Sequence, residues 1–553
     1  ILPPAVRAIN ILDKTNMNLD KINSIYLNIL TLLEKLDIQV DKPDQLIKQV
    51  KQILLNLSIQ AYDYIIQHLT KKEGVLRKYV LGKKNDFTGR TVITVDPRLK
   101  IDEVRVPYVM FCAGYFPQVL YELSKSYNGI VAYDLLTKYM NMEEAVPLNI
   151  QLEIEDTINR VANDKIVLLN RQPTLHRSSI QAFKPILSKQ KTLSIPMQIC
   201  NPFNADFDGD TMAIYFPQTD SAIKEAKEKM MSSKNLLLPG SLQYGAFTQD
   251  LVLGLWFVTS EEGDKSQILE ITNVKQVFDL KLGTWIKYNN EINTAGRFLV
   301  SQILGIPITT ALTKKQIYNI LTTLIQTNDP NIVDKLHNLQ QLTLKYTLVS
   351  ISINDFVEEG EWAHNYDNVN WNQLTIRKLA EETAASKKQL TLTQNISAMI
   401  TSGARGSLDQ WSQCTLLRGF VRNANGKLML PPVLSSLIEG YSPTEVVLSS
   451  VGNRKGIIDK ALSTANSGYL TRKLVYSTQH ILLTDEEDCG TTEGITVTLT
   501  KQNIDKYLFR YTTDDQYIDQ SNYKDFIDKT VTLRSPLHCH SKTGICKKCF
   551  SIH

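Results

Sequence analysis

The chain has 553 residues, of which 43% are hydrophobic and 21% are charged, and its formal net charge is +4. This composition is typical of globular proteins, and the length predicts roughly three to five domains. No apolar run is long enough to span a bilayer and no charged-then-apolar leader is present, so we expect a soluble protein inside the cell. Since the net charge is small, any nucleic-acid-binding surface must be a local basic patch.

Residues 1–70 have the pattern of helices. Apolar residues recur at helix-compatible spacings over 19–36 and again from about 45 to 69. Pro43 lies between the two runs, and proline cannot continue a helix interior. The pattern predicts two long helices with a short connection, which form an antiparallel hairpin. Half of an ordinary helical bundle is the alternative.

Residues 71–98 are basic and are interrupted by glycine. The stretch 71–90 holds seven Lys or Arg against two Asp or Glu. Glycine lets a backbone approach a sugar-phosphate chain closely, so this composition suits phosphate contact. A solvated basic loop is the alternative, and these residues alone do not exclude it.

The rest of the chain changes pattern several times. Residues 91–260 have short β-branched runs between Pro, Gly and Asn turns, which predicts a mixed α+β or barrel-like region. Residues 261–400 are expected to be largely helical. One long helix is expected after Pro443, and short strands are expected around the cysteines of 485–553.

The most informative residues are the carboxylates of the string Asn204–Asp210. Asp206, Asp208 and Asp210 alternate, so they point the same way in a strand and can converge in a tight glycine-containing loop. Three carboxylates this close repel one another unless a cation compensates or solvent screens them. Ligands that are all oxygen suit Mg²⁺.

A calcium loop and an acidic surface turn are the alternatives to a magnesium site. A calcium-binding EF-hand loop needs Gly at its sixth and Glu at its twelfth position, but counting from Asp206 these positions hold Thr211 and Pro217. An acidic surface turn predicts polar flanks, whereas the string runs into the apolar stretch 212–216, which has the pattern of a buried strand. Carboxylates next to a core strand are costly unless they have a function.

Four of the seven cysteines lie near the C-terminus. These four are Cys489, Cys539, Cys546 and Cys549. An odd total that clusters late in a large chain favours a metal site over a disulfide framework. The other three, Cys112, Cys200 and Cys414, have the mixed or apolar neighbours of small core residues.

The string Asn204–Asp210 resembles the metal-binding loop of the largest (beta-prime) subunit of bacterial-type multisubunit DNA-dependent RNA polymerases. The resemblance implies an α+β multidomain chain with a double-psi β-barrel, on which Asp206, Asp208 and Asp210 hold the catalytic Mg²⁺. It also implies nucleotidyl transfer to an RNA 3′-hydroxyl on a DNA template. A second Mg²⁺ would arrive with the nucleotide.

The stretch 168–177 is similar to the family's loop beside the incoming nucleotide. By this resemblance Arg171 and Asn204 would bind the ribose hydroxyls. The 2′-hydroxyl is the group that distinguishes the sugar of a ribonucleotide from that of a deoxyribonucleotide. His176 and Arg177 in the same stretch fit a structural role equally well.

The stretch 81–95 is similar to the switch segment, which holds the template strand near the active site in this family. Its basic positions correspond to Lys83, Lys84 and Arg90. The predicted hairpin resembles the clamp helices, where promoter-specificity factors dock. Residues 19–60 depart from the family there, because they are richer in Ile, Leu and Asn and poorer in charge.

The stretch 452–472 resembles the bridge helix, which crosses the cleft opposite the metal. Thr464 and Ala465 would let the template base lie flat against this helix. The phosphates would be met by Arg454, Lys455 and Arg472. An ordinary amphipathic core helix is the alternative, but it does not explain three glycines that each cost about 1 kcal/mol in a helix.

The four late cysteines resemble the bacterial-type zinc site, in which one distant cysteine joins a C-x₆-C-x₂-C knuckle. By this resemblance Cys489, Cys539, Cys546 and Cys549 bind one Zn²⁺. Four thiolates leave no position for water, so the site would be structural. His538 and His540 are spare donors.

The resemblance implies six parts. They are a clamp hairpin (1–70), a switch segment (71–98), the barrel (99–260), a pore region (261–429) that contains the similar stretch 399–407, a bridge-helix region (430–484) and a zinc module (485–553).

The trigger loop and the first part of the clamp are expected on other polypeptides, so we expect activity only in an assembly. The expected partners are the polypeptide with the trigger loop, one or more beta-type second-largest subunits, a specificity factor at the hairpin, the DNA template, the RNA and the nucleotides, with no membrane. The divergence and composition resemble the split subunits of giant bacteriophages. We therefore expect a location in the bacterial host cytoplasm, a phage-made compartment or the virion, and a truncated bacterial or plasmid enzyme is the alternative source.

Two further classes of function fit part of the sequence. An inactive zinc-bearing scaffold does not need all three aspartates. An RNA-templated polymerase can share a similar acidic barrel, but the bridge-like segment together with four zinc cysteines favours a DNA template.

Overall fold

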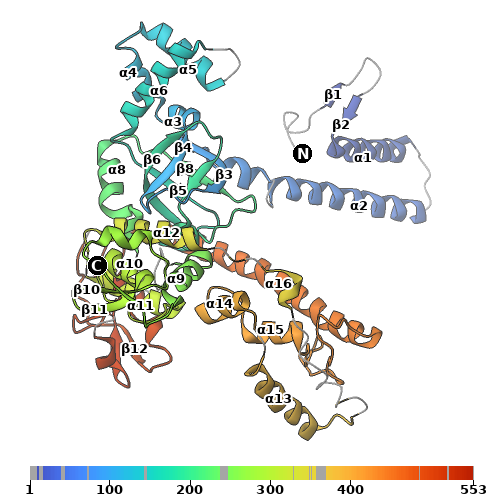
Figure 1. The fold of residues 1–553 in the computed structure, drawn as a ribbon. Helices are drawn as coiled ribbons and strands as arrows, with labels where there is room; N and C mark the ends of the chain where they lie inside the picture. Colours follow the sequence, from blue (N-terminus) through green and yellow to red (C-terminus); the bar gives the residue numbers. More distant parts are fainter. Residues whose placement is uncertain are drawn as a thin grey trace. The chain divides into compact units, whose positions relative to one another are not determined.

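The computed structural model of the chain divides into two compact units, residues 1–86 and 87–553 (Figure 1). The residues that the structure describes are 9–11, 17–38, 44–70, 74–141, 146–236, 247–327, 329–347, 349, 351–356, 366, 369–390, 392–484, 486–519 and 522–551.

The first unit contains the helical hairpin that the apolar spacing predicts. Helix α1 covers Lys21–Ile38 and helix α2 covers Asp44–Leu69. A short antiparallel ladder of β1 (Ile9–Ile11) and β2 (Met17–Leu19) precedes them, and a π-helical turn, η2, covers Leu76–Leu81. The expected break at Pro43 lies outside the described residues.

The two helices of the hairpin pack through a small apolar core and one polar contact. The core consists of Ile22, Ile25 and Ala61. One carboxylate oxygen of Asp20 accepts hydrogen bonds from the backbone N–H of Ile22 at 3.0 Å and from the hydroxyl of Tyr64 at 2.6 Å. Asp20 therefore caps α1 and also ties it to α2.

The second unit is built on a closed six-stranded barrel with the strand order β3-β7-β4-β6-β5-β8 (Figure 1). The strands are β3 (Thr88–Val95), β4 (Glu103–Pro107), β5 (Val167–Asn170), β6 (Ile180–Ser188), β7 (Leu193–Ile195) and β8 (Thr211–Tyr215). The pairs β3–β7 and β4–β6 are parallel and the other pairs are antiparallel. The mixed or barrel-like region expected over 91–260 is confirmed. The barrel starts at β3, earlier in the chain than residue 99.

Alternate residues of the barrel strands fill the main hydrophobic core. They include Ile93, Val104, Val106, Val167, Leu169, Phe183, Met212 and Ile214. Helices between β4 and β5 extend this core, and they are α3 (Tyr108–Gly114), α4 (Phe116–Leu123), α5 (Gly129–Asn141) and α6 (Leu148–Ala162). The stretch 212–216 is the buried strand that the sequence predicts, because three of its side chains are at most 1% exposed.

Helices are the main elements of residues 220–415, and those within 261–400 agree with the largely helical stretch that the sequence predicts there. The helices are α8 (Asp220–Glu225), α9 (Asp250–Ser260), α10 (Ala295–Leu304), α11 (Lys314–Gln326), α12 (Ile332–Tyr346), α13 (Gln373–Lys387), α14 (Gln394–Ser402) and α15 (Leu408–Thr415). A three-stranded sheet that the sequence analysis did not anticipate lies among them, with strands β9 (Ile268–Glu270), β10 (Trp285–Tyr288) and β11 (Glu291–Thr294). The side-chain amide of Gln340 on α12 donates to the Pro97 carbonyl at 2.6 Å, which joins this region to the barrel.

The expected long helix is present as α16, which runs from Pro443 to Thr478 over 36 residues. Pro443 occupies its first turn, and Ser442 and Glu445 form a capping box. Of its residues, only Ser449 is buried. The helix is therefore not an ordinary core helix of this chain.

The C-terminal part forms a small module with its own core. Its elements are β12 (Ile495–Thr498), β13 (Arg510–Tyr511), β14 (Tyr517–Ile518), β15 (Thr530–Leu533) and α17 (Lys547–Phe550). Strand β12 pairs with β15 and strand β13 pairs with β14, which confirms the expected short strands. The core residues include Leu499, Leu508 and Ile518.

Single turns of helix complete the described chain. They are η3 (Arg177–Ser179), η4 (Met197–Ile199), α7 (Cys200–Phe203), η5 (Ala226–Met230), η6 (Ser232–Asn235), η7 (Val274–Asp279), η8 (Ile353–Asp355), η10 (Ile504–Lys506), η11 (Tyr523–Phe526) and η12 (Pro536–His538).

Gly114 provides a test of the packing beneath the barrel. A Cβ added there would lie 2.2 Å from the ring of Phe216, which is 1% exposed. We expect Gly114→Ala to destabilise the barrel by about 1–3 kcal/mol, because a packed core does not accept an added methyl group. Hydrogen exchange of the backbone amides of β3 and β8 would measure the loss.

Gly456→Ala on α16 is the matched control, since nothing lies within 4 Å of the Cβ it would add. Alanine favours a helix over glycine, so this change should leave the exchange of β3 and β8 unaltered. Equal exchange in the two variants would contradict the packing described for Gly114.

Candidate metal sites and their surroundings

The acidic string lies in a loop between α7 and β8 whose two ends are fixed by hydrogen bonds. Asn204 ends α7 in a left-handed conformation, with φ 47°, and Gly209 has φ 120°. The Ala205 N–H donates to the Cys200 carbonyl at 2.9 Å, and the carbonyl of Asp210 accepts from the Ile93 N–H of β3 at 3.0 Å. The loop therefore turns sharply between two anchored ends, which Gly209 permits at low cost.

This turn brings the three predicted carboxylates together. Each of Asp206, Asp208 and Asp210 offers an oxygen, and these oxygens lie within 4.8 Å of one another. Asp206 and Asp208 are exposed, whereas Asp210 is half-buried. Three oxygen donors on one small loop, with the first two open to solvent, fit a Mg²⁺ ion that keeps several waters.

The charges of the loop show why a cation suits it. The hydrogen bond that Asp206 shares with the Asp208 side chain raises the pKa of Asp206, and partial burial and the charges of Asp208 and Asp210 act in the same direction. Because a carboxylate between two others resists ionisation, a bound cation would relieve the repulsion.

Arg171 neutralises one of the three carboxylates. It follows β5, and its Nε and Nη2 each lie 2.9 Å from Oδ2 of Asp210. Burial raises the pKa of Asp210, but the Asp206 N–H and the Arg171 guanidinium outweigh burial and lower it. The structure therefore brings Arg171 to Asp210, at the end of the acidic loop opposite to Asn204 in sequence.

His176 belongs to the same predicted nucleotide loop as Arg171. Its Nδ1 lies 2.7 Å from the Ser178 hydroxyl, and Ser178 is buried. This contact gives His176 a structural partner. A nucleotide-binding role for His176 stays untested.

The basic residues of the predicted switch segment fall in both units. Lys83 and Lys84 are exposed near the end of the first unit. Arg90 belongs to the second unit, where it lies on β3 and its Nε donates to the Thr211 hydroxyl at 2.8 Å. The Arg90 side chain therefore reaches Thr211, the residue that directly follows the acidic loop.

Sequence reasoning missed a cavity of ≈ 940 Å³ beside β3. Its wall includes the side chains of Arg90, Lys138, Lys189 and Lys191. Lys189 pairs with Glu155 at 3.0 Å and Lys138 pairs with Asp134 at 3.0 Å. No sequence motif marks this cavity, because its wall comes from segments that are far apart in the chain.

The residues predicted to contact nucleic acid on α16 are mostly exposed. Arg454, Thr464 and Ala465 are exposed, and the guanidinium of Arg472 lies 5.2 Å from the centre of the Tyr476 ring. Lys455 differs from them, because its Nζ donates to the Ala424 carbonyl at 2.9 Å. Lys455 therefore holds the helix against a preceding loop.

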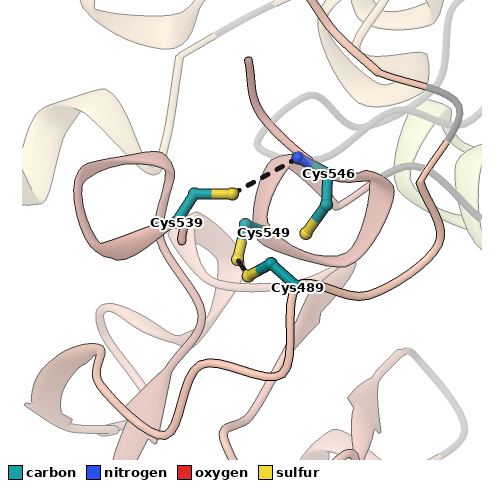
Figure 2. Close-up of side chains that lie close together, drawn as sticks. All are labelled: Cys489, Cys539, Cys546 and Cys549. Carbon is teal, nitrogen blue, oxygen red and sulfur yellow. Dashed lines mark hydrogen bonds between the residues drawn. The ribbon is translucent and has the colours of Figure 1, made fainter. Parts of the chain in front are cut away.

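Figure 2 shows the four late cysteines converging from two segments of the C-terminal module. Their sulfur atoms lie within 4.8 Å of one another, and those of Cys489 and Cys549 are 3.6 Å apart. Cys546 and Cys549 are fully buried. Four sulfur donors at this separation fit a tetrahedral Zn²⁺ site.

Backbone donors already favour a thiolate at this cluster. Burial raises the pKa of Cys489, but hydrogen bonds from the backbone of His540 and Thr491 and from neighbouring thiols lower it to about 6. The His540 N–H lies 3.4 Å from the Cys489 sulfur. The structure shows only this backbone N–H of His540 directed at the cluster, so the spare-donor interpretation of its ring gains no support.

Arg534 is a neighbour of the cluster that sequence reasoning missed. It is 4% exposed, its Nη1 lies 3.9 Å from the Cys489 sulfur and 4.0 Å from that of Cys549, and its Nη2 pairs with Asp488 at 3.0 Å. A buried guanidinium offsets the negative charge of four thiolates. Its only sequence signal is an arginine directly after the apolar strand β15.

Comparison with known proteins gives matches to one family. A family model described as RNA polymerase Rpb1, domain 2 matches residues 82–232, and a model described as RNA polymerase Rpb1, domain 5 matches residues 440–533. The DNA-directed RNA polymerase subunit beta′ of a Nitratiruptor species is 29% identical, over 100% of this chain and 42% of its own length. The subunit of the same name from Dehalococcoides mccartyi is 28% identical, over 100% of this chain and 48% of its own length.

The chain spans less than half the length of these curated relatives. The two model matches contain the acidic loop and α16, and the second match ends just before the cysteine knuckle. Among the described residues, no helix is both long enough and apolar enough to cross a membrane.

The cysteine cluster gives a direct test. We expect Cys546→Ser to lower the zinc content by one ion per chain, because a neutral hydroxyl replaces a buried thiolate ligand. Elemental analysis of the purified chain measures this. Cys414→Ser is the matched control, because Cys414 lies outside the cluster, and equal zinc in both variants would exclude the site.

Proposed function

We propose that this chain, which belongs to the family of largest (beta′-type) subunits of multisubunit DNA-directed RNA polymerases, holds the catalytic Mg²⁺ of such an enzyme. The observation that carries the proposal is the convergence of Asp206, Asp208 and Asp210 within 4.8 Å on a loop anchored to the barrel. The reaction is nucleotidyl transfer to an RNA 3′-hydroxyl on a DNA template. We further propose that the barrel is of the double-psi type.

The triad would supply the Mg²⁺ ligands, and the hydrogen bonds around the loop would hold these ligands in place. When bound, one Mg²⁺ on the triad would activate the RNA 3′-hydroxyl, and a second, brought by the nucleotide, would stabilise the pyrophosphate leaving group. Positioning and charge stabilisation are the main sources of catalysis in phosphoryl transfer. The hydrogen bonds that fix both ends of the loop would therefore preserve the geometry that the reaction needs.

Arg171 and Asn204 would recognise the ribose of the incoming nucleotide. Asn204 is exposed and belongs to the acidic loop, and the side chain of Arg171, which is 19% exposed, pairs with Asp210 of the same loop. Both carry N–H donors, which suit ribose hydroxyls.

Template contact would involve basic residues of both units. Lys83 and Lys84 are exposed, and Arg90 lies on the wall of the basic cavity. Lys191 of the same wall comes from a different segment, so the positive charge is gathered by the fold. Clustered cations of this kind favour a phosphate backbone over a small neutral ligand.

Helix α16 would act as the bridge helix. Thr464 and Ala465 are small and exposed, as a surface for a template base requires. Large apolar side chains are exposed along the same helix, including Ile457 at 70% and Leu462 at 59%. Such a surface supports the proposal that other subunits cover α16 and that the chain acts only in an assembly.

The remaining parts would have structural and docking roles. The cysteine module would hold one structural Zn²⁺, and the hairpin would receive a promoter-specificity factor. A beta-type subunit and a polypeptide with the trigger loop would complete the active site. Origin from a giant bacteriophage stays a prediction.

Primer extension tests the catalytic role. The chain is assembled with the other polymerase polypeptides of its source, and an RNA–DNA hybrid, Mg²⁺ and ribonucleotides are added. We expect Asp208→Ala to lower extension by at least about 10²–10³-fold, because a ligand of the catalytic charge is lost. Equal extension by wild type and mutant would place the active site elsewhere and would favour the scaffold function.

Asp220→Ala is the control for this experiment. Asp220 is an exposed residue in the first turn of α8 and lies outside the loop, so extension should be unchanged. Replacing the DNA template with RNA in the same assay separates DNA-templated from RNA-templated synthesis.

The proposed bridge helix makes a separate prediction about salt. We expect Arg454→Ala to reduce the slope of log binding constant against log salt by about 1, since each phosphate contact releases about one counterion. Hybrid binding by the assembled enzyme at several salt concentrations measures the slope. Lys501→Ala, which changes an exposed residue of the cysteine module, should leave the slope unaltered. Equal slopes for wild type, Arg454→Ala and Lys501→Ala would exclude the Arg454 contact.

A further inference from the structure

One oxygen of the acidic triad is already fully engaged by protein donors. Oδ2 of Asp210 accepts hydrogen bonds from Nε of Arg171 at 2.9 Å and from the backbone N–H of Asp206 at 3.2 Å, and Nη2 of Arg171 forms an ion pair with the same oxygen at 2.9 Å. All three donors lie on the same oxygen. Oδ1 is therefore the atom of this carboxylate that remains for a cation.

Both partners of this contact are held by the barrel. Arg171 directly follows β5, Asp210 directly precedes β8, and the two strands pair with Asn170 opposite Ala213. The side chains of Arg171 and Asp210 are only 19% and 21% exposed. Little freedom is lost when such a pair forms, and partial burial shields it from solvent.

We propose that Arg171 is a positioning residue for the metal ligand Asp210, in addition to its proposed contact with the nucleotide ribose. Its Nε–Nη2 edge fixes Oδ2 and so leaves Oδ1 as the oxygen of Asp210 that can share a cation with Asp206 and Asp208. This inference rests on the proposed function, because it presumes that the triad binds Mg²⁺.

The geometry lets one guanidinium perform both tasks. Within the described part of the chain, Nη1 of Arg171 makes no hydrogen bond, so this nitrogen can donate to a ribose hydroxyl while the other two hold Asp210. Lysine carries a single nitrogen and cannot reproduce this fork. Arg171 thus links the metal ligand to the nucleotide sugar through one rigid group.

A purely electrostatic role for Arg171 makes an opposite prediction. If Arg171 only takes the place of the cation, it competes with Mg²⁺, and removing its positive charge strengthens Mg²⁺ binding through Coulomb's law. If Arg171 positions Asp210, removing it weakens Mg²⁺ binding, as the loss of a group that orients a metal ligand does. The sign of the change therefore separates the two.

The experiment is Fe²⁺-directed cleavage of the assembled enzyme without nucleotides. Fe²⁺ with ascorbate and peroxide cuts the chain next to its binding site, and Mg²⁺ protects that site by competition. We expect Arg171→Gln to raise the Mg²⁺ concentration for half-protection by about 10-fold or more. An unchanged or lower concentration would overturn the inference.

Two further variants serve as controls. Arg171→Lys retains the positive charge on a single nitrogen, so its Mg²⁺ affinity should lie between those of wild type and Arg171→Gln. Asn204→Gly removes the proposed ribose contact and keeps the left-handed backbone at this position, so it should leave half-protection unaltered and raise the KM for ribonucleotides. A shift in half-protection for Asn204→Gly equal to that of Arg171→Gln would show a general loss of the loop and would also overturn the inference.

The outcome for wild type separates this inference from the proposed function. Cleavage of wild type within 203–212 that Mg²⁺ suppresses supports the metal site, whatever Arg171 does. If wild type shows no such cleavage, the proposed function itself fails. If wild type is cleaved and Arg171→Gln has the same half-protection, only the positioning role fails.

Discussion

The structure depends on how it holds three negative charges on a loop of seven residues. The oxygens of Asp206, Asp208 and Asp210 lie within 4.8 Å, a separation at which carboxylates repel strongly unless something compensates. Two backbone hydrogen bonds anchor the loop ends, and Arg171 neutralises the innermost carboxylate. These contacts exist because the barrel closes, since closure places β3 and β5 on either side of β8. The barrel and its surrounding helices can therefore be understood as the support of one electrostatically costly loop.

The same chain leaves large apolar surfaces open elsewhere. Leu27 and Tyr62 on the hairpin and Val447 and Ile457 on α16 are between 58% and 70% exposed. A helix of 36 residues with one buried residue gains little stability from its own chain. These surfaces agree with the similarity of the chain to polymerase subunits, because a subunit buries such faces against its partners.

The C-terminal module shows a second way of holding like charges. Four cysteine sulfurs converge there, and the buried Arg534 forms an ion pair with the partly exposed Asp488 beside them. In both sites an arginine lies against the anionic ligands from a neighbouring strand end, Arg171 after β5 and Arg534 after β15. The two arginines therefore offset part of the negative charge of the clusters without a metal ion. This lowers the free-energy cost of folding around an empty site.

The sequence by itself determined the local elements and the residues of the two candidate metal sites. Apolar spacing predicted α1, α2 and α16, and the alternation of Asp206, Asp208 and Asp210 before an apolar run predicted both the ligand set and the buried strand β8. These features follow from residues close in the chain, where periodicity and spacing are sufficient. Only the tertiary structure decided the strand order of the barrel, the pairing of Arg171 with Asp210, the cavity wall and the place of Arg534. Each of these joins residues that are distant in sequence, and barrel closure rather than local propensity sets their distances, so no pattern along a single chain could reveal them.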